Sequence, residues 1–286
     1  MILVTGGSGF VGRHLVARLV SQGERVRVLA RSAADLPGTE LAQGDVRDLS
    51  SVVSAARGCA AVIHLVGIIR ERRDATFQTV HVEGTRTVVE ACRQAGVSRL
   101  LHMSALGSRP NARSRYHQTK WEAEELVRGS GLPATIFRPS VMFGAGNNFL
   151  PAARGLLHRG PVIPIIGSGE SLLQPVWVED VVSCFVGALS RPEASGRAYE
   201  LGGAERITFE QLVGLLAEAD GVRKRKLHLP VTPMRAVAWL GSRLIPNFPL
   251  TPDQLTMLLE DNVCDIAPMR ETFGVQPASL RDHLGD

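Results

Sequence analysis

Short apolar runs alternate with longer helix-like stripes through the first half of the chain. Runs such as Ile2-Leu3-Val4 and RVRVLA are too short for helices, and between them apolar residues recur at three- and four-residue spacing. This alternation is typical of parallel strands joined by crossover helices. Strands are expected at 2–4, 25–30, 41–44, 61–66, 98–103, 134–138 and, late in the chain, 198–201. Helices are expected at about 49–57, 82–95 and 116–130, after a first one with Leu15, Val16, Leu19 and Val20 on one face, which Gly23 ends.

This rhythm ends after Gly144. Proline and glycine cluster in residues 151–175, and prolines separate the helical patterns of the tail. We therefore expect an α/β fold, a Rossmann-type doubly wound parallel sheet with a small, mainly helical C-terminal lobe. The sheet domain is predicted to comprise residues 1–148 with about 176–203 returning to it, and the lobe about 149–175 and 204–286.

A glycine-rich turn joins the first strand to the first helix. In TGGSGFVG, glycines 6, 9 and 12 match the dinucleotide fingerprint in its strand-turn-helix context. Glycine allows a tight turn and close approach to a pyrophosphate, and the helix N-terminus offers N–H donors to its charge. The sequence predicts a dinucleotide site here, and the alternative is a glycine turn without a ligand. The predicted contacts are Gly6, Ser8, Gly9, Phe10, Val11 and Gly12.

The end of the second predicted strand distinguishes the two nicotinamide dinucleotides. A carboxylate there would bind a ribose 2′-hydroxyl, but this chain has Arg31 and Ser32, which suit the 2′-phosphate of NADP. The alternative for Arg31 is a solvated surface charge. Asp45, followed by Val46, ends the third strand and is a candidate acceptor for the adenine amino group, or an ordinary turn aspartate.

Several strings along the chain resemble the short-chain dehydrogenase/reductase superfamily, in particular its extended and atypical members. The resemblance covers nearly the whole chain and is closest to bacterial relatives of the NADPH-binding accessory subunit of respiratory complex I. It is carried by TGGSGFVG, GDV (44–46), HLVGIIRE (64–71), VHVEGTRTVVEA (80–91), HMSALG (102–107), YHQTK (116–120), FRPSVMFG (137–144), QPVWVEDV (174–181) and LLEDNV (258–263).

The resemblance implies roles for Tyr116 and Lys120. In active members a tyrosine is the general acid/base, a lysine four residues later holds the nicotinamide ribose, and a serine or threonine orients the substrate. The spacing places Tyr116 and Lys120 on one helical face, where the cation favours phenolate, although YxxxK also occurs by chance. Ala105 stands where the substrate-orienting hydroxyl is expected, and Ser104 is a weak substitute.

The same resemblance implies further cofactor contacts at the strand ends. Besides Ser104, Tyr116 and Lys120, these are Leu65, Val66, Gly67, Met103, Pro139, Ser140 and Val141. His64 and His102 lie on apolar strands without a second ligand at metal spacing, so we assign no metal.

Composition excludes several classes of protein. Aromatic residues are scarce at 5% and do not interleave with basic ones, which argues against a nucleic-acid-binding platform. Four dispersed cysteines (Cys59, Cys92, Cys184 and Cys264) form no zinc or disulfide pattern, so we expect them to be reduced and mostly buried. We also expect no signal peptide, no membrane-spanning helix and a cytoplasmic location.

The C-terminal part contains a basic run, Arg223-Lys224-Arg225-Lys226, before an apolar helical stripe in residues 233–245. A basic run beside an amphipathic helix suits peripheral contact with the inner face of the membrane. The alternative is a helix that faces the core of the lobe, with a solvated charge run.

Two functions follow from these observations. In the first, the protein holds NADPH in a structural, assembly or sensing role, with a respiratory complex or quinone enzyme as its partner; Ala105 favours this function. In the second, it is an active NADP-dependent oxidoreductase or nucleotide-sugar epimerase/dehydratase; Tyr116 and Lys120 favour this one. The sequence identifies no substrate.

Overall fold

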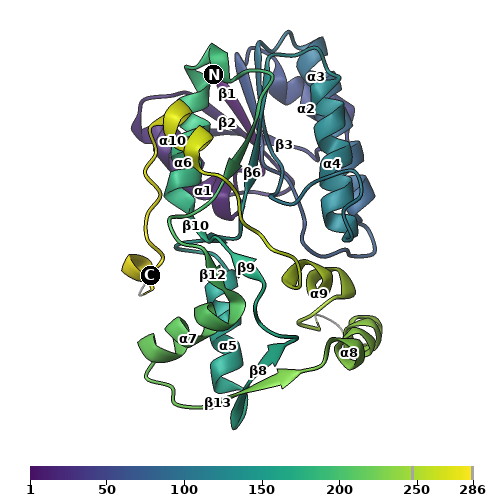
Figure 1. Ribbon diagram of the computed structural model, residues 1–286. Coiled ribbons are helices and arrows are strands. Elements are labelled where there is room, and N and C mark those ends of the chain that lie inside the picture. Colours follow the sequence, from purple (N-terminus) through teal and green to yellow (C-terminus); the bar gives the residue numbers. More distant parts are fainter. Residues whose placement is uncertain (246–247, 285–286) are drawn as a thin grey trace. The chain divides into compact units, whose positions relative to one another are not determined.

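The computed structural model describes residues 1–245 and 248–284 (Figure 1). The chain separates into two compact units. The first unit consists of Met1–Pro139, Val178–Leu201 and Ile266–Gln276, and the second of Ser140–Trp177, Gly202–Asp265 and Pro277–Asp286. A segment near the C-terminus therefore belongs to the same unit as the N-terminal strand.

The first unit is built on a seven-stranded sheet with the order β11-β6-β5-β4-β1-β2-β3, in which every neighbouring pair is parallel. This confirms the predicted doubly wound sheet and the late strand that returns to it. Buried apolar residues fill both faces of the central strands, as a parallel sheet covered by helices requires. The strands are β1 (Ile2–Thr5), β2 (Val26–Ala30), β3 (Thr39–Gln43), β4 (Ala61–His64), β5 (Arg99–Met103), β6 (Ala134–Pro139) and β11 (Ala198–Leu201).

Helices cover the two faces of this sheet. Three lie along one face and three along the other (Figure 1). Valines and small residues of α2 and α3 form the core with β1, β4 and β5, because their apolar stripes face the strands. On one side are α2 (Leu49–Ala56), α3 (Gly84–Gln94) and α4 (Arg115–Arg128), and on the other α1 (Phe10–Ser21), α6 (Val178–Leu189) and α10 (Ala267–Phe273).

A π-helical segment, η1 (Gln78–Glu83), precedes α3 where the sequence predicted an ordinary helix from residue 82. Its start is fixed by reciprocal bonds: the Thr76 N–H donates to Thr79 Oγ1 at 3.0 Å, and the Thr79 N–H donates to Thr76 Oγ1 at 3.1 Å. The wider turn carries His81 within reach of the Ile68 backbone. Such segments are frequent at functional sites.

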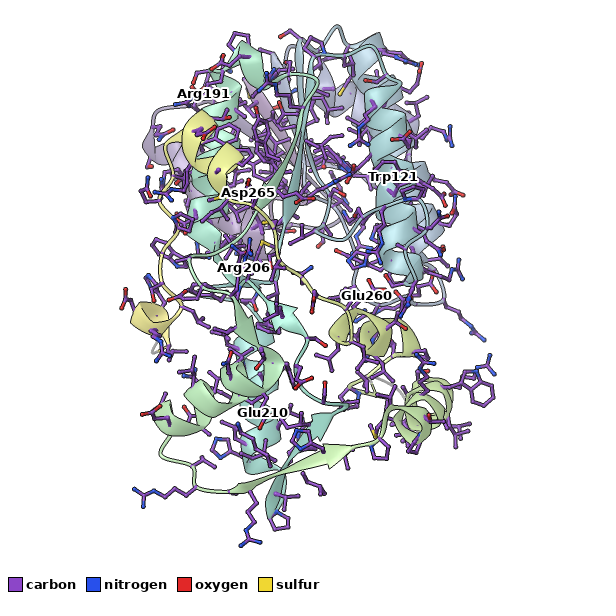
Figure 2. All side chains as sticks on the ribbon, in the orientation of Figure 1. Trp121, Arg191, Arg206, Glu210, Glu260 and Asp265 are labelled. Carbon is purple, nitrogen blue, oxygen red and sulfur yellow. The ribbon has the colours of Figure 1, made fainter. Side chains whose placement is uncertain are left out.

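The second unit combines short strands with helices around its own core, which includes Phe143, Leu157 and Leu212. The last two residues of the predicted basic run, Arg225 and Lys226, begin strand β13, which pairs in parallel with β8. Lys226 and His228 of this strand contact Glu210. Figure 2 labels Glu210 on its helix. The elements are β7 (Met142–Phe143), β8 (Val162–Ile166), β9 (Leu172–Leu173), β10 (Val176–Trp177), β12 (Ile207–Thr208), β13 (Arg225–Leu229), α5 (Phe149–His158), α7 (Phe209–Ala219), α8 (Val231–Leu244), α9 (Pro252–Leu258) and η3 (Arg281–His283); η2 (Pro192–Ala194) belongs to the first unit.

Each of the four cysteines is buried, and none forms a disulfide with another described residue. Among the described residues, no helix is both long and apolar enough to cross a membrane.

Candidate functional site

The turn between β1 and α1 requires glycine at position 6 for its backbone conformation and at position 12 for lack of space. Gly6 has a φ of +79°, and its carbonyl accepts from the Gly9 N–H at 3.0 Å. A Cβ placed on Gly12 would lie 2.2 Å from Gly6 O and 2.6 Å from Gly7 Cα. The glycine at position 12 is therefore required for the first turn of α1 to pack directly against the loop.

The N-terminus of α1 suits a negatively charged ligand. Its N-cap, Gly9, offers no side chain to the first amide groups, and the first turn contains no acidic residue. The N–H groups that a helix leaves unpaired at this end are thus available to a pyrophosphate, and the helix dipole favours its charge. Ser8 is exposed, Phe10 is half-buried and Val11 is buried in the sheet-facing side of the helix.

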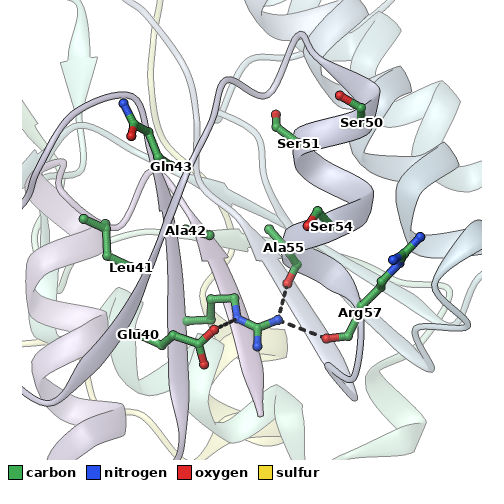
Figure 3. Close-up of a pocket in the computed structure, with 10 residues that line it drawn as sticks. Glu40, Leu41, Ala42, Gln43, Ser50, Ser51, Ser54, Ala55 and Arg57 are labelled. Atoms are coloured by element: carbon green, nitrogen blue, oxygen red, sulfur yellow. Dashed lines mark hydrogen bonds and ion pairs between the residues drawn. The ribbon is translucent and has the colours of Figure 1, made fainter.

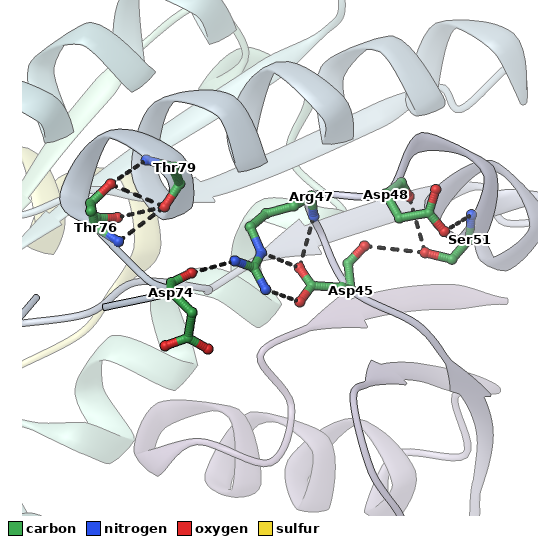
Figure 4. A network of polar contacts seen from close by, with 7 residues as sticks. All are labelled: Asp45, Arg47, Asp48, Ser51, Asp74, Thr76 and Thr79. Atoms are coloured by element: carbon green, nitrogen blue, oxygen red, sulfur yellow. Dashed lines mark hydrogen bonds and ion pairs between the residues drawn. The ribbon is translucent and has the colours of Figure 1, made fainter. Parts of the chain in front are cut away.

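The strand end that was predicted to select NADP presents cations. Arg31 and Ser32 follow β2 and are exposed. Asp45 is held by Arg47, whose Nε donates to Oδ1 at 2.9 Å and Nη2 to Oδ2 at 2.7 Å (Figure 4). These bonds, with a smaller contribution from Arg31, hold the pKa of Asp45 below its usual range. The sequence analysis missed Arg47, although an aspartate in a turn commonly bonds the residue two positions later. Val46, between them, is buried beside α3.

Arg47 also fastens the loop that follows β4. Its Nη1 donates to the Asp74 carbonyl at 2.6 Å (Figure 4). Glu71 accepts from the Phe77 N–H at 2.8 Å at the start of η1. The loop after β4 is therefore held by Arg47, which precedes α2, and by its own bond to the start of η1.

The loop that follows β4 approaches α4 at Gly67 and Lys120. Leu65 is buried, Val66 is half-buried and Gly67 is exposed. A Cβ on Gly67 would lie 3.2 Å from Lys120 Nζ and 3.6 Å from His81 Nε2. A side chain at position 67 would therefore crowd the Lys120 ammonium group, and glycine leaves this space free.

Lys120 is buried on the face of α4 that packs on the sheet. Its Nζ donates to the Met103 carbonyl at 2.9 Å. Burial lowers the pKa of Lys120 to about 8, while nearby Glu124 acts to raise it. A lysine with this pKa is mostly protonated at pH 7, so the group presents a positive charge in a dehydrated environment.

Tyr116 lies one turn before Lys120, as the spacing predicted, and is half-buried. Its ring makes edge contacts with Phe77, His81 and His117 at centroid distances of 5.8, 5.4 and 5.3 Å. α4 begins at this point because Ser114 Oγ, its N-cap, accepts from the His117 N–H. Aromatic packing and the cap together fix the phenol-bearing turn.

Three neutral histidines surround the lysine. Burial lowers the pKa of His64 to about 3 and that of His81 to about 2, and it lowers the pKa of His102 well below the usual value. His64 lies between β1 and α3, with Nδ1 2.6 Å from Thr5 Oγ1 and Nε2 3.2 Å from Thr85 Oγ1. Because these rings are uncharged, they add no positive charge to that of Lys120.

Ala105, which the resemblance places at the position of the substrate-orienting hydroxyl, is buried. Ser104 is also buried, and its hydroxyl donates to Ser108 Oγ at 3.2 Å within the turn after β5. The serine next to the expected position thus bonds to its own turn.

Glu124 anchors the helix that carries Tyr116 and Lys120. Its side chain is fully buried and accepts from Arg138 Nε at 2.8 Å and Nη2 at 2.6 Å, and from Arg128 Nη2 at 2.7 Å. The FRPS string therefore acts through Arg138, which joins β6 to α4. Sequence reasoning noted this arginine but not its partner, 14 residues earlier in the chain.

The remaining predicted contacts divide between the two units. Pro139 ends β6 and its carbonyl accepts from the Leu106 N–H at 2.9 Å. Ser140 and Val141 belong to the second unit, where Asn262 Oδ1 accepts from Ser140 Oγ at 2.6 Å and from the Val141 N–H at 3.1 Å. Asn262 is the asparagine of LLEDNV, so that string supports the backbone after β6.

A separate pocket of about 540 Å³ lies between β2, β3 and α2 and contains none of the predicted site residues (Figure 3). Arg27 lines it and donates to Glu40 Oε1 at 2.6 Å and to the Ala55 carbonyl at 2.7 Å. Its charge is therefore already matched within the protein.

Comparison with known families identifies the fold seen here. Residues 2–202 match the NAD dependent epimerase/dehydratase family. The chain belongs to this family. The match confirms the short-chain dehydrogenase/reductase resemblance and places the glycine turn, the strand ends, Tyr116 and Lys120 inside the matched region.

Relatives of this chain include both a respiratory subunit and an enzyme. NADH dehydrogenase (ubiquinone) 1 alpha subcomplex subunit 9 from Arabidopsis thaliana mitochondria is 30% identical over 273 residues, which are 91% of this chain and 68% of that protein. The ceramide reductase of Caulobacter vibrioides is 32% identical over 237 residues, 80% of this chain and 74% of that protein. The solved structure of MoeE5 in complex with UDP-glucose and NAD has a TM-score of 0.78 at 22% identity, covers 99% of this chain and 95% of its own, and shows the shared fold.

Proposed function

We propose that this protein binds NADP(H) and retains it without turnover, in a structural, assembly or sensing role beside a respiratory complex or quinone enzyme. One observation carries the proposal: the cofactor-holding parts are complete, whereas the substrate-orienting hydroxyl is missing. Gly12, the N-terminus of α1 and the Lys120–Gly67 approach fit a dinucleotide. Ala105 stands in place of the hydroxyl. The similarity to a mitochondrial NADH dehydrogenase (ubiquinone) subunit supports the respiratory partner. The location that we propose with it is cytoplasmic, at the inner face of the membrane.

The bound dinucleotide would supply a hydride carrier, and this chain's residues would hold it. The amide N–H groups at the start of α1 would donate to the pyrophosphate, Arg31 to the 2′-phosphate, and Lys120 Nζ to the nicotinamide ribose. Because Lys120 is buried and already bonded to the Met103 carbonyl, its ammonium is fixed before any ligand arrives. Such preorganisation favours tight retention.

A second function has its own support. Tyr116 and Lys120 share one face of α4, and a buried ammonium near the phenol favours its deprotonation, as an NADP-dependent oxidoreductase or epimerase/dehydratase requires. The similarity to a ceramide reductase supports this function.

Release of the bound ligand by denaturing the purified protein separates the two functions. We expect NADP(H), identified by mass, in a near-equal ratio to protein, and no reoxidation of the reduced form by carbonyl or nucleotide-sugar substrates. Protein that turns the cofactor over with any of these compounds would overturn the retention proposal in favour of the enzyme.

Arg31→Asp should reverse the cofactor preference. The wild type should bind NADPH more tightly than NADH, because a charge-assisted bond to the 2′-phosphate is worth about 1.5–3 kcal/mol, or roughly ten- to a hundred-fold in affinity. The substituted carboxylate would repel the phosphate. Calorimetric titration with both cofactors measures the ratio. Arg25→Asp is the matched control: it makes the same charge change directly before the first residue of β2 and should leave the cofactor preference intact. Equal affinities of the wild type for NADPH and NADH would refute the assignment.

Substitutions at Tyr116 and Lys120 distinguish binding from chemistry. If Tyr116 has no catalytic role, Tyr116→Phe should change cofactor affinity by only a few-fold and leave the cellular phenotype unaltered. Lys120→Ala should weaken binding by about ten-fold or more, because a charged donor to the ribose is lost. Thermal melting of both variants verifies folding. A Tyr116→Phe phenotype equal to gene deletion, in folded protein that still binds cofactor, would instead establish the enzyme.

A further inference from the structure

Helix α8 (Val231–Leu244) buries small residues and exposes large apolar ones, the reverse of a helix that packs into a core. Its two buried residues, Ala238 and Gly241, are among its smallest, and a Cβ on Gly241 would lie 2.6 Å from the Phe248 ring. Its large apolar side chains face outward instead. Leu240 is 51% exposed and Leu244 69% exposed. The buried face of α8 therefore consists of small residues, and its large apolar side chains lie on the exposed face.

The exposed residues of α8 form two neighbouring stripes. Val237, Leu240 and Leu244 follow the three- and four-residue spacing of one face, and Ile245 extends it with 54% exposure. Arg235, Trp239 and Arg243 follow four-residue spacing beside it, with the Arg243 guanidinium 4.1 Å from the Trp239 ring centroid. An apolar stripe beside a stripe of arginine and tryptophan is the arrangement of a helix that lies in a membrane interface.

Charge favours an anionic surface over a protein surface of mixed sign. Between Asp220 and Asp253 the sequence contains six lysine or arginine residues and no acidic residue. Two of these cations are engaged locally: Lys224 Nζ donates to the Leu157 carbonyl at 2.7 Å, and Lys226 Nζ lies 3.2 Å from Glu210 Oε1. The cations placed on the helix itself, Arg235 and Arg243, are exposed.

We infer that α8 docks on an anionic phospholipid bilayer, with Val237, Leu240 and Leu244 inserted and Arg235 and Arg243 at the headgroups. The inference makes specific the membrane location within the proposed function and does not depend on whether the cofactor turns over. The structure also changes which cations matter: the arginines of the helix, rather than the lysines of the preceding basic run, provide the attraction.

Co-sedimentation of the full chain with vesicles tests the inference. The wild type should bind phosphatidylcholine vesicles that contain phosphatidylglycerol, bind pure phosphatidylcholine far less, and dissociate as salt is added. Leu240→Ser with Leu244→Ser should abolish binding. Arg235→Gln with Arg243→Gln should weaken it by about 25-fold, or about five-fold for each cation near the surface.

The matched control is Lys224→Gln with Lys226→Gln, which removes the same charge from side chains bonded within the protein and should weaken binding by less than five-fold. Melting temperature and cofactor affinity, measured on every variant, separate this result from the outcome of the cofactor proposal. Failure of the wild type to bind anionic vesicles, or equal losses in the arginine and lysine pairs, would overturn the inference. Wild-type self-association that the serine pair removes, without vesicle binding, would assign the face to a second copy of the chain.

Discussion

Arg138→Leu is expected to lower the free energy of unfolding by about 3–5 kcal/mol. Arg138 donates two bonds, at 2.8 and 2.6 Å, to the Glu124 carboxylate, whose exposure is 0%. Removing Arg138 leaves the buried Glu124 carboxylate with the bond from Arg128 but without the two bonds from Arg138. A buried charge that loses its partners is costly because it also lacks solvation by water. Urea unfolding followed by circular dichroism measures the loss.

Arg128→Leu is the control for that substitution. It removes another cation from the same carboxylate, but the Arg128 side chain is 35% exposed, so its bond is weakened by competition with water. We expect a loss below about 1 kcal/mol. Similar small losses in both variants would show that Glu124 does not depend on Arg138, and that α4 is held mainly by apolar packing.

Gly12→Ala is expected to reduce cofactor affinity by about a hundred-fold or more. The new Cβ would lie 2.2 Å from Gly6 O and 2.7 Å from the Gly7 carbonyl carbon, and neither atom belongs to a flexible side chain. The start of α1 must move away from the turn, which costs about 3 kcal/mol in overpacking and displaces the amides that would hold the pyrophosphate. Calorimetric titration with NADPH measures the affinity, and thermal melting measures the accompanying loss of stability.

Gly155→Ala tests whether that effect arises from crowding rather than from the substitution itself. Gly155 lies within α5, where the nearest atom to a new Cβ is a terminal nitrogen of Arg159 at 4.0 Å. Alanine there should raise stability by up to about 1 kcal/mol and leave cofactor affinity unchanged. If Gly12→Ala also left affinity unchanged, the glycine turn would not be the phosphate-binding element.

Local periodicity was sufficient to predict the sheet domain. The predicted stretches overlap every strand of the seven-stranded sheet. Central strands such as β1 and β4 are uninterrupted apolar runs because they are buried on both faces, whereas the edge strands β3 and β11 are partly exposed. The glycines of the first turn were informative for the same local reason, since a positive φ at Gly6 and the absence of a Cβ at Gly12 are properties of the chain itself. The π-helical turn at residues 78–83 was missed because groups outside the segment stabilise it: the Ile68 N–H donates to His81, and Glu71 accepts from the Phe77 N–H at its start.

The sequence by itself determined the family-type turn, the parallel sheet and the shared face of Tyr116 and Lys120, all of which depend on residues close together in the chain. Only the tertiary structure decided which partners these residues have. The Met103 carbonyl bonds Lys120, and Glu124 bonds Arg138, across elements that periodicity cannot place beside one another. The outward face of α8 was decided in the same way: an amphipathic pattern states which residues share a side, but packing against Phe248 determines which side is buried.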